Sequence, residues 1–283
     1  MFYVGFIATV AREQAIFCKE RPLVDKPLLS KEPGSSGDFP AVTPSRSDGD
    51  GRHIHNKILL GLSARESEML SPKLEFIRLQ VQQVLHEPGA TLKSAYFPNS
   101  GLVSILTVFP DGKVLEVGLV GSEGFVGLPL VAGFRTANTR AIVQIEGSAF
   151  RVDAGALREI LNRSQELDRR LEQSSQMLTM EITQLAACNR LHEVNERLAR
   201  WLLTCADRIH SDSVPITQEF LSHMLGTRRS SVTVAARMLE TAGLISNALG
   251  RVDIIDRAKL EQASCDCYRM IRTQRAEWLN ESV

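Results

Sequence analysis

The sequence predicts an α+β chain that consists of an antiparallel β-roll (a double-stranded β-helix), a long helix and a C-terminal winged helix-turn-helix. Three stretches support this prediction. Short β-rich runs alternate with turn signals over residues 84–152, and residues 165–209 contain no proline or glycine. Residues 214–245 hold two amphipathic segments on either side of one glycine, a pattern that is typical of a helix-turn-helix.

The N-terminal residues differ in composition from the rest of the chain. Residues 22–55 are rich in proline, glycine, serine and aspartate, and such a segment cannot bury enough apolar surface to order itself. We therefore expect residues 1–55 to form a disordered extension. Two short helices are expected over residues 57–79, and a capping box between Ser63 and Glu66 begins the second of them.

The β-roll is expected to occupy residues 56–163. Proline-glycine, asparagine-serine-glycine and aspartate-glycine signals mark its turns. The β-branched and apolar runs between these signals predict strands at Leu102–Phe109, Val114–Val120, Ala141–Ile145 and Ala149–Val152.

Apolar residues recur at alternating spacings of three and four along the long helix, which is expected over residues 164–193. This spacing is typical of a coiled-coil seam, so we expect a homodimer that forms through this helix. The expected interface residues are Leu171, Leu178, Ile182 and Leu185. In the alternative interpretation, the seam packs on the β-roll of its own chain. A hinge near residues 192–193 separates this helix from a C-terminal domain that is expected to span residues 194–283.

The C-terminal domain carries the helix-turn-helix pattern. Thr217 is a suitable N-cap for the first helix, Gly226 suits the turn, and Gly243 ends the second helix before a wing strand. The first turn of such a second helix contacts base edges and phosphates, which arginine and serine side chains bind well. The residues expected to contact double-stranded DNA are Thr217, Gln218, Arg228, Arg229, Ser230, Ser231 and Thr233. Helix-turn-helix geometry also occurs in proteins that do not bind DNA.

Composition places limits on the function. The formal net charge is zero, so any basic surface for nucleic acid must be local. Five cysteines make no even disulfide framework, and we expect reduced thiols in a cytoplasmic protein. No apolar run is long enough to span a membrane, and the N-terminus lacks the basic region of a signal peptide.

The order of these elements resembles that of the Crp/Fnr superfamily of bacterial transcription regulators. The matching segments over residues 56–260 are His86–Gly89, Asp111–Gly112, Gly121–Gly127 and the winged helix. The resemblance implies a homodimer in which the roll is a sensor domain of the cyclic-nucleotide-binding type. It further implies that double-stranded DNA, and also RNA polymerase, are partners.

Family members that bind cyclic AMP use a glycine-rich turn, a glutamate for the ribose, an arginine-serine pair for the phosphate and hydroxyl residues on the long helix. In this sequence Phe125 stands where the glutamate would be. The resemblance implies an effector pocket at Gly124, Phe125, Gly127, Arg135, Thr136 and Thr183. Because the ribose acceptor is missing, we expect weak or no binding of cyclic AMP. A different anionic effector or an apolar effector remains open.

Other cofactors have less support. A family iron–sulfur cluster needs four cysteines, three of them near the N-terminus, where Cys18 stands alone. Cys188 and His192 lie four residues apart, but two ligands do not make a site. Cys265 and Cys267 lack the CxxC spacing, so no metal site is expected. Haem ligation by His86 or His192 is left open.

The sequence contains none of the common catalytic motifs, so we do not expect an enzyme. The expected function is a sequence-specific DNA-binding transcription regulator. The alternative is a ligand-sensing or interaction module with a vestigial DNA-binding head. In its favour, Ser230 and Val234 stand where the cyclic-AMP regulator has a glutamate and an arginine that read bases.

Overall fold

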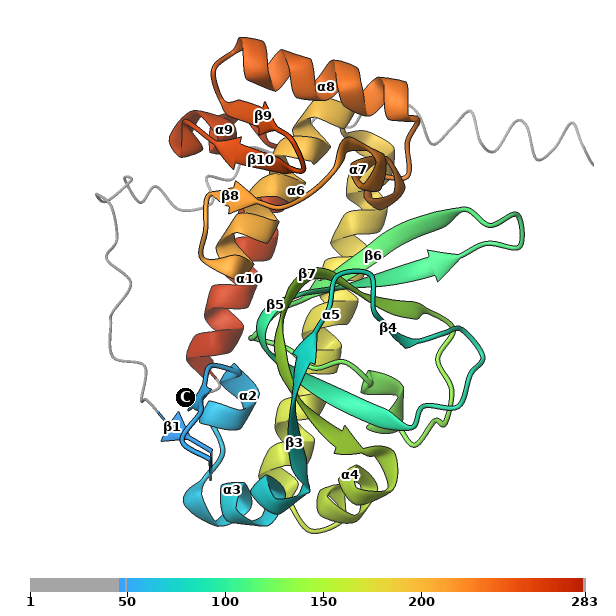
Figure 1. The fold of residues 1–283 in the computed structure, drawn as a ribbon, viewed down its shortest axis with the longest axis vertical. Helices are drawn as coiled ribbons and strands as arrows, with labels where there is room; N and C mark the ends of the chain where they lie inside the picture. Colours follow the sequence, from blue (N-terminus) through green and yellow to red (C-terminus); the bar gives the residue numbers. More distant parts are fainter. Residues whose placement is uncertain (1–45, 49, 282–283) are drawn as a thin grey trace, which may run out of the picture. The chain divides into compact units, whose positions relative to one another are not determined.

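The structure is a computed structural model that describes residues 46–48 and 50–281. In this part of the chain, a β-roll lies beside the long helix α5, and a small winged head follows (Figure 1). This arrangement confirms the fold class predicted from the sequence. No helix among the described residues is long and apolar enough to cross a membrane.

The described chain begins earlier than expected. The strands β1 (Arg46–Ser47) and β2 (His53–Ile54) pair as a short antiparallel hairpin. Ile54 is buried against the roll, and the Asn99 side chain donates to the carbonyl oxygen of His53 at 3.0 Å. The prediction that residues 1–55 are disordered is therefore wrong for 46–48 and 50–55, and residues 1–45 lie outside the described part.

Two short helices follow as predicted, but the segment after them is a strand. The helices are α2 (Lys57–Leu60) and α3 (Ala64–Leu70), with a 3₁₀ turn η1 (Ser71–Lys73) behind them. Ser63 caps α3 by accepting from the Glu66 amide at 3.4 Å. The Glu66 carboxylate does not close the capping box, because it accepts instead from the Ser164 hydroxyl at 2.7 Å. Residues 74–79 were expected to be helical, but they form a strand that pairs with a later strand of the roll along its whole length.

The roll is built from five antiparallel strands. They are β3 (Leu74–Leu79), β4 (Val84–His86), β5 (Ser94–Val108), β6 (Val114–Val120) and β7 (Arg140–Asp153). The sheet order is β3-β7-β5-β6, and β4 also pairs with β7. The two runs predicted between residues 141 and 152 thus form one strand. β5 likewise continues through the turn signals at 98–101, because bulges take up the irregular residues there.

Two helices cover the roll before the head begins. They are α4 (Ala154–Leu161) and α5 (Gln165–Leu191). Ser164 caps α5 by accepting from the Leu167 amide at 3.1 Å. Leu167 and Leu171 at the start of α5 are fully buried in the same apolar core as Phe97 and Phe150 of the sheet.

The hinge and the winged head agree with the prediction. The helix α5 ends at Leu191, and α6 (Val194–Ile209) begins with a capping box between Glu193 and Glu196. The head then consists of β8 (Ser213–Val214), α7 (Gln218–Met224), α8 (Arg229–Thr241), β9 (Ile245–Ala248), β10 (Arg251–Ile254) and α9 (Arg257–Ala263).

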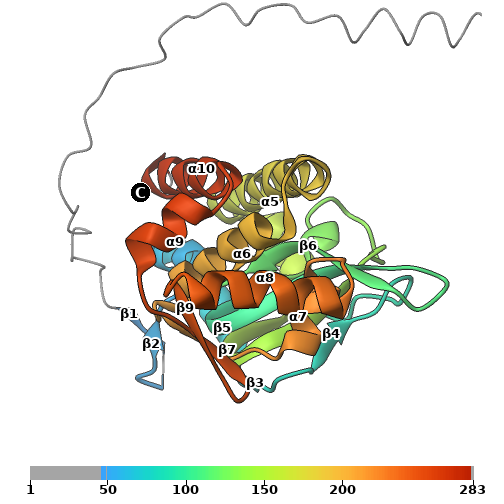
Figure 2. The same cartoon turned by 90° about the horizontal axis from the view of Figure 1, so that it is seen from above.

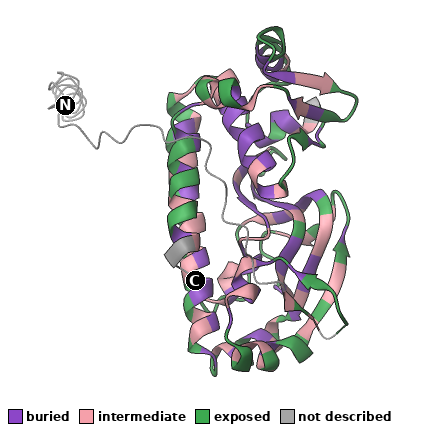
Figure 3. Ribbon diagram, turned by 90° about the vertical axis from the view of Figure 1, so that its left-hand side faces the viewer, coloured by how far each residue is buried: buried purple, intermediate pink, exposed green. Residues whose placement is uncertain are grey.

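One continuous apolar core joins the head to the roll. Trp201 of α6 is the largest fully buried side chain. Around α6, this core includes the roll residues Leu102, Leu106, Leu119 and Ile145 and the head residues Leu221, Val232, Ala236 and Leu239. Buried residues (purple in Figure 3) accordingly extend along α6 and through the roll. Each fully buried large apolar side chain contributes about 1.5–3 kcal/mol, so this shared core stabilises the contact between the head and its own roll.

The last helix, α10 (Cys267–Glu281), does not remain with the head. It runs back beside α5, as Figures 1 and 2 show. The C-terminal domain predicted from residue 194 to 283 therefore contains a helix that packs against the long helix and the sensor side of the molecule.

Candidate DNA-binding surface, sensor cavity and thiol cluster

Local sequence signals position the helix-turn-helix. The Thr217 hydroxyl accepts from the Phe220 amide at 3.3 Å and so begins α7. Gly226 in the turn has a φ of +57°, which favours glycine, and a Cβ there would lie 2.5 Å from Leu115 of β6. The turn therefore packs closely on the roll. Gly243, with a φ of +70°, ends the second helix before the wing.

The second helix of the motif, α8, has one buried and one exposed face. Its apolar side, Val232, Ala235, Ala236 and Leu239, is buried in the common core. The expected DNA contacts Arg228, Arg229 and Ser230 are exposed, while Ser231 and Thr233 are half-buried. Thr217 is exposed at the start of α7, and the side chain of Gln218 lies outside the described part.

Among the described residues, the exposed arginines at the start of α8 and along it have no carboxylate partner. Arg228 and Arg229 form no ion pair within the described residues, whereas Arg208, Arg257 and Arg275 do. Arg237 is also exposed and unpaired in this part of the chain, and it lies two turns after Arg229 on the same face. Arg237 was not among the residues predicted to contact DNA, although its spacing of eight residues from Arg229 could have indicated it.

Apolar side chains border these arginines. Val234 and Met238 are 59% and 54% exposed on α8. Together with Glu193–Asn195 and the serines of the first turn, they line a groove of about 340 Å³ between α8 and the start of α6. Exposed apolar groups beside unpaired arginines suit contacts with a thymine methyl group and neighbouring phosphates.

A small cavity in the sensor domain lies between the roll and α5. Its volume is about 30 Å³, and Gly124, Phe125, Leu178 and Trp278 are among its lining residues. A water molecule needs at least about 10–15 Å³, whereas pockets for drug-sized ligands are about 300–1,000 Å³. Phe125 is buried and packs on Phe97, with ring centroids 4.8 Å apart. The ring therefore occupies part of the core and offers no acceptor to a ligand.

Four charged side chains, from three helices and the turn after β6, meet at this cavity. The Glu123 carboxylate accepts from Arg208 of α6 at 2.9 Å and lies 3.4 Å from Arg275 of α10, and Arg208 also pairs with Glu181 of α5. Burial raises the pKa of Glu123, but Arg275 and Arg208 outweigh this effect and lower it to about 2. The carboxylate is thus held as an anion, and the chain's own ion pairs fill the space beside the glycine-rich turn.

The structure brings together only part of the predicted effector pocket. Gly124 and Phe125 line the cavity, and Gly127 is buried beside Ala95. Arg135 and Thr136 are exposed on a loop. Thr183 is exposed on α5, where its hydroxyl donates to the carbonyl oxygen of Thr179 at 2.9 Å.

The predicted dimer seam lies mostly against the roll. Leu171 is fully buried within its own chain, which leaves no surface for a second chain. Leu178 and Ile182 are half-buried and face Gly118 of β6, where a Cβ would lie 2.7 Å from Leu178. Leu185 is half-buried as well. Another face of α5 is exposed and includes Met180, Thr183, Ala187 and Leu191.

A buried polar network joins α6 to the roll. The Trp201 indole donates to Glu116 at 2.7 Å, the Ser104 hydroxyl donates to the other carboxylate oxygen at 2.7 Å, and Gln144 contacts the same hydroxyl. Burial raises the pKa of Glu116 to about 7, against the smaller opposing effects of these hydrogen bonds. Sequence inspection missed this network because β5, β6, β7 and α6 each supply one member.

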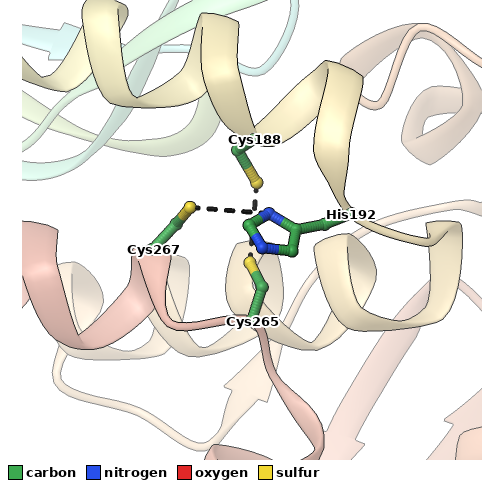
Figure 4. Close-up of side chains that lie close together, drawn as sticks. All are labelled: Cys188, His192, Cys265 and Cys267. Atoms are coloured by element: carbon green, nitrogen blue, oxygen red, sulfur yellow. Dashed lines mark hydrogen bonds between the residues drawn. The ribbon is translucent and has the colours of Figure 1, made fainter. Parts of the chain in front are cut away.

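Four residues that the sequence analysis treated as separate pairs lie together (Figure 4). They are Cys188 near the end of α5, His192 just after it, Cys265 in the loop after α9 and Cys267 at the start of α10. Their sulfur and nitrogen atoms all lie within 4.8 Å of one another. A hydrogen bond with Cys265 and the charge of Arg200 lower the pKa of the Cys188 thiol, against the effect of burial. His86, the other haem candidate, is half-buried on β4.

Comparisons with known proteins agree with this architecture. Residues 76–164 match the model of the cyclic nucleotide-binding domain, and residues 196–263 match that of the Crp-like helix-turn-helix domain. The transcriptional regulator LdrP of Thermus thermophilus is 25% identical over 200 residues, which cover 65% of this chain and 94% of LdrP.

Solved structures share the fold. FixK2 from Bradyrhizobium japonicum superposes with a TM-score of 0.59 at 15% identity, covering 68% of this chain and 98% of that one. A CRP/FNR-family transcriptional regulator from Thermus thermophilus gives a TM-score of 0.58 at 21% identity, covering 67% of this chain and 98% of that one.

A roll of the cyclic-nucleotide-binding type, joined by a long helix to a winged helix-turn-helix, defines a transcription regulator with a sensor domain and a DNA-binding head. The chain belongs to the Crp/Fnr family of these regulators.

Proposed function

We propose that the chain acts as a homodimer that reads a specific DNA sequence with α8. The observation that carries this proposal is the exposed side of α8 and its N-cap, where Arg228, Arg229 and Arg237 have no ion-pair partner among the described residues. Unpaired guanidinium groups bind phosphates and guanine edges without first breaking a salt bridge. Because the net charge of the chain is zero, this local basic face supplies the attraction to DNA.

The arginines have different proposed tasks. Arg229 is the first residue of α8 and is proposed to read a base edge, while Arg228 at the N-cap is proposed to bind phosphate. Arg237, two turns farther along the same face, is a further proposed phosphate contact. Contact with RNA polymerase remains an expectation from the family.

Dimerisation is proposed to use the exposed face of α5. Met180 is 38% exposed and Leu191 is 73% exposed, with Thr183 and Ala187 between them at spacings of three and four. These spacings place the four residues on one side of the helix. A second copy that covers this side would remove the two large apolar side chains from water. A dimer also supplies two α8 helices, as a site with two half-sites requires.

We further propose that the sensor domain does not use the cyclic-AMP cassette of its relatives. Phe125 replaces the expected carboxylate, the cavity is about 30 Å³, and the ion pairs of Glu123, Arg208 and Arg275 occupy its polar side. A cyclic nucleotide would need to displace these buried pairs, and separating a buried pair is costly.

Binding titrations of single alanine variants at several salt concentrations test the DNA proposal. Arg229→Ala should cost roughly 1–3 kcal/mol and relax the preference at one base pair in each half-site. Arg228→Ala should weaken binding to all sequences alike and lower the salt dependence by about one unit of slope. Arg163→Ala, an exposed arginine in the loop before α5, is the matched control. Equal behaviour of all three variants would remove the support for α8 as the reading helix.

A further inference from the structure

The thiol cluster stands apart from the DNA surface and from the sensor cavity. Its two halves come from distant segments that meet because α10 folds back along α5. Cys188 and His192 lie one turn apart at the end of α5, where the His192 amide donates to the carbonyl oxygen of Cys188 at 3.2 Å. Cys265 lies in the loop after α9, and Cys267 is the first residue of α10. The imidazole and the three sulfur atoms point toward a common centre (Figure 4).

We propose that Cys188, His192, Cys265 and Cys267 bind one zinc ion. Three thiolates and one imidazole are a common ligand set for structural zinc, which prefers a closed tetrahedral site. The proposal goes beyond the proposed DNA-binding function and does not depend on it.

Two of the distances between ligand atoms match a single small ion, and all the ligand atoms lie within 4.8 Å of one another. A zinc ion with Zn–S near 2.3 Å and Zn–N near 2.0 Å holds its ligand atoms at tetrahedral edges of about 3.5–3.8 Å. The Cys188 and Cys265 sulfur atoms are 3.5 Å apart, and the Cys267 sulfur lies 3.6 Å from Nδ1 of His192. An iron–sulfur cluster attaches its ligands to different iron atoms, and so it holds some of them farther apart than one shared ion does.

The surroundings suit a thiolate centre. Cys188, Cys265 and Cys267 are all buried, and the Gln184 side chain donates to the Cys267 sulfur at 3.0 Å. Hydrogen bonds of this kind fix the orientation of metal ligands. Cys267 also lies at the N-terminus of α10, where the helix dipole favours a negative sulfur.

A buried positive charge balances the proposed site. Zinc with three thiolates and a neutral imidazole has a net charge of −1. Arg200 of α6 is buried beside Cys188, and its Nε has no hydrogen-bond partner among the described residues. Arg197 is buried nearby on the same helix. Buried charges require such compensation, and the zinc-thiolate centre would supply it to these guanidinium groups.

A bound ion would connect the long helix to the head. His192 directly follows α5 at the hinge to α6, and α6 lies in the common core with α8. A metal bond from this hinge to the start of α10 would fix the angle between the long helix and the head. The sequence alone could not show this, because each pair lacks the spacing of a known zinc motif.

Metal analysis of the purified full-length protein tests the proposal. The protein is prepared without a metal-affinity step, and its metals are measured by mass spectrometry. We expect one zinc ion per chain. After removal of zinc, cobalt(II) should restore a site with the intense visible bands and thiolate charge-transfer bands of tetrahedral coordination. A zinc content near zero together with an octahedral cobalt spectrum would overturn the proposal, and so would stoichiometric iron with acid-labile sulfide.

The zinc content and cobalt spectra of cysteine variants test whether the ion is bound at this cluster. Cys265→Ser and Cys267→Ser should each lose zinc and the cobalt–thiolate bands. Cys205→Ala should keep both, because Cys205 is buried in the core around α6 and outside the cluster. Zinc should raise the melting temperature of the stripped wild type and of Cys205→Ala, and should not raise that of Cys267→Ser. Retention of full zinc by both serine variants would place the ion elsewhere and contradict the assignment.

Discussion

The buried carboxyl group of Glu116 should make stability depend on pH in an unusual direction. Its pKa rises from an ordinary 4.5 to about 7 in the folded chain because it is buried. Between these values the folded state keeps the proton while the unfolded state releases it. The free energy of unfolding contributed by this group is therefore highest below pH 4.5, falls as the pH rises toward 7, and stays constant above that.

The magnitude follows from the two pKa values. At about 1.4 kcal/mol per pKa unit, the loss between pH 4.5 and pH 7 is about 3 kcal/mol. Glu116→Gln should remove this pH-dependent loss of stability, because a neutral amide can accept a hydrogen bond from Trp201 and donate one to Ser104 in the same place. The free energy of unfolding of the variant, relative to that of the wild type, should rise by about 3 kcal/mol between pH 4.5 and pH 8.

Urea unfolding at a series of pH values, followed by tryptophan fluorescence, measures this difference. Subtracting the wild type from the variant removes the contributions of the other titrating groups, among them His86 with its lowered pKa. Glu172→Gln, on an exposed turn of α5, is the matched control for the substitution itself. A difference between Glu116→Gln and wild type that stays the same at every pH would refute the reasoning.

Two further predictions concern assembly and effector. Met180→Asp on the exposed face of α5 should dissociate the dimer in sedimentation velocity, because it places unpaired charge in an apolar contact. Val81→Asp, an exposed apolar position on the roll, should leave it intact, and a monomeric wild type at micromolar concentration would contradict the proposal. Calorimetry with cyclic AMP should detect weak or no binding, because Phe125 removes the ribose acceptor and the cavity is small. A dissociation constant in the low micromolar range or tighter that Arg135→Ala abolishes would show that the cassette is functional.

The sequence predicted best those elements that local signals define. Thr217, Gly226 and Gly243 fix the start, the turn and the end of the two head helices through a cap and two positive φ angles. Such signals act over a few residues and can be read without the fold. The hinge between α5 and α6 was predictable for the same reason, since Glu193 begins a new capping box.

The sequence-based prediction failed where contacts between residues distant in the sequence determine the local structure. Asn99 lies among turn signals, yet it is buried and accepts from the His55 amide at 2.7 Å, which orders the hairpin before the roll. Glu66 fits a local cap but binds Ser164 instead. Cys188 and Cys265 share a site only because α10 returns along α5. The two residues of each pair lie far apart in the sequence. The spacing of apolar and polar residues along the chain therefore could not predict these contacts.

Selection of genomic DNA fragments by the purified full-length protein tests most directly the claim that α8 reads a specific sequence. The selection is run with the protein as purified and after chelation, so that either metal state can bind. We expect enrichment of a palindromic sequence whose half-sites lie about one helical turn apart, with the preference relaxed at one base pair per half-site in Arg229→Ala. If the wild type enriches no palindrome in either state, the head is vestigial and the proposed function is wrong.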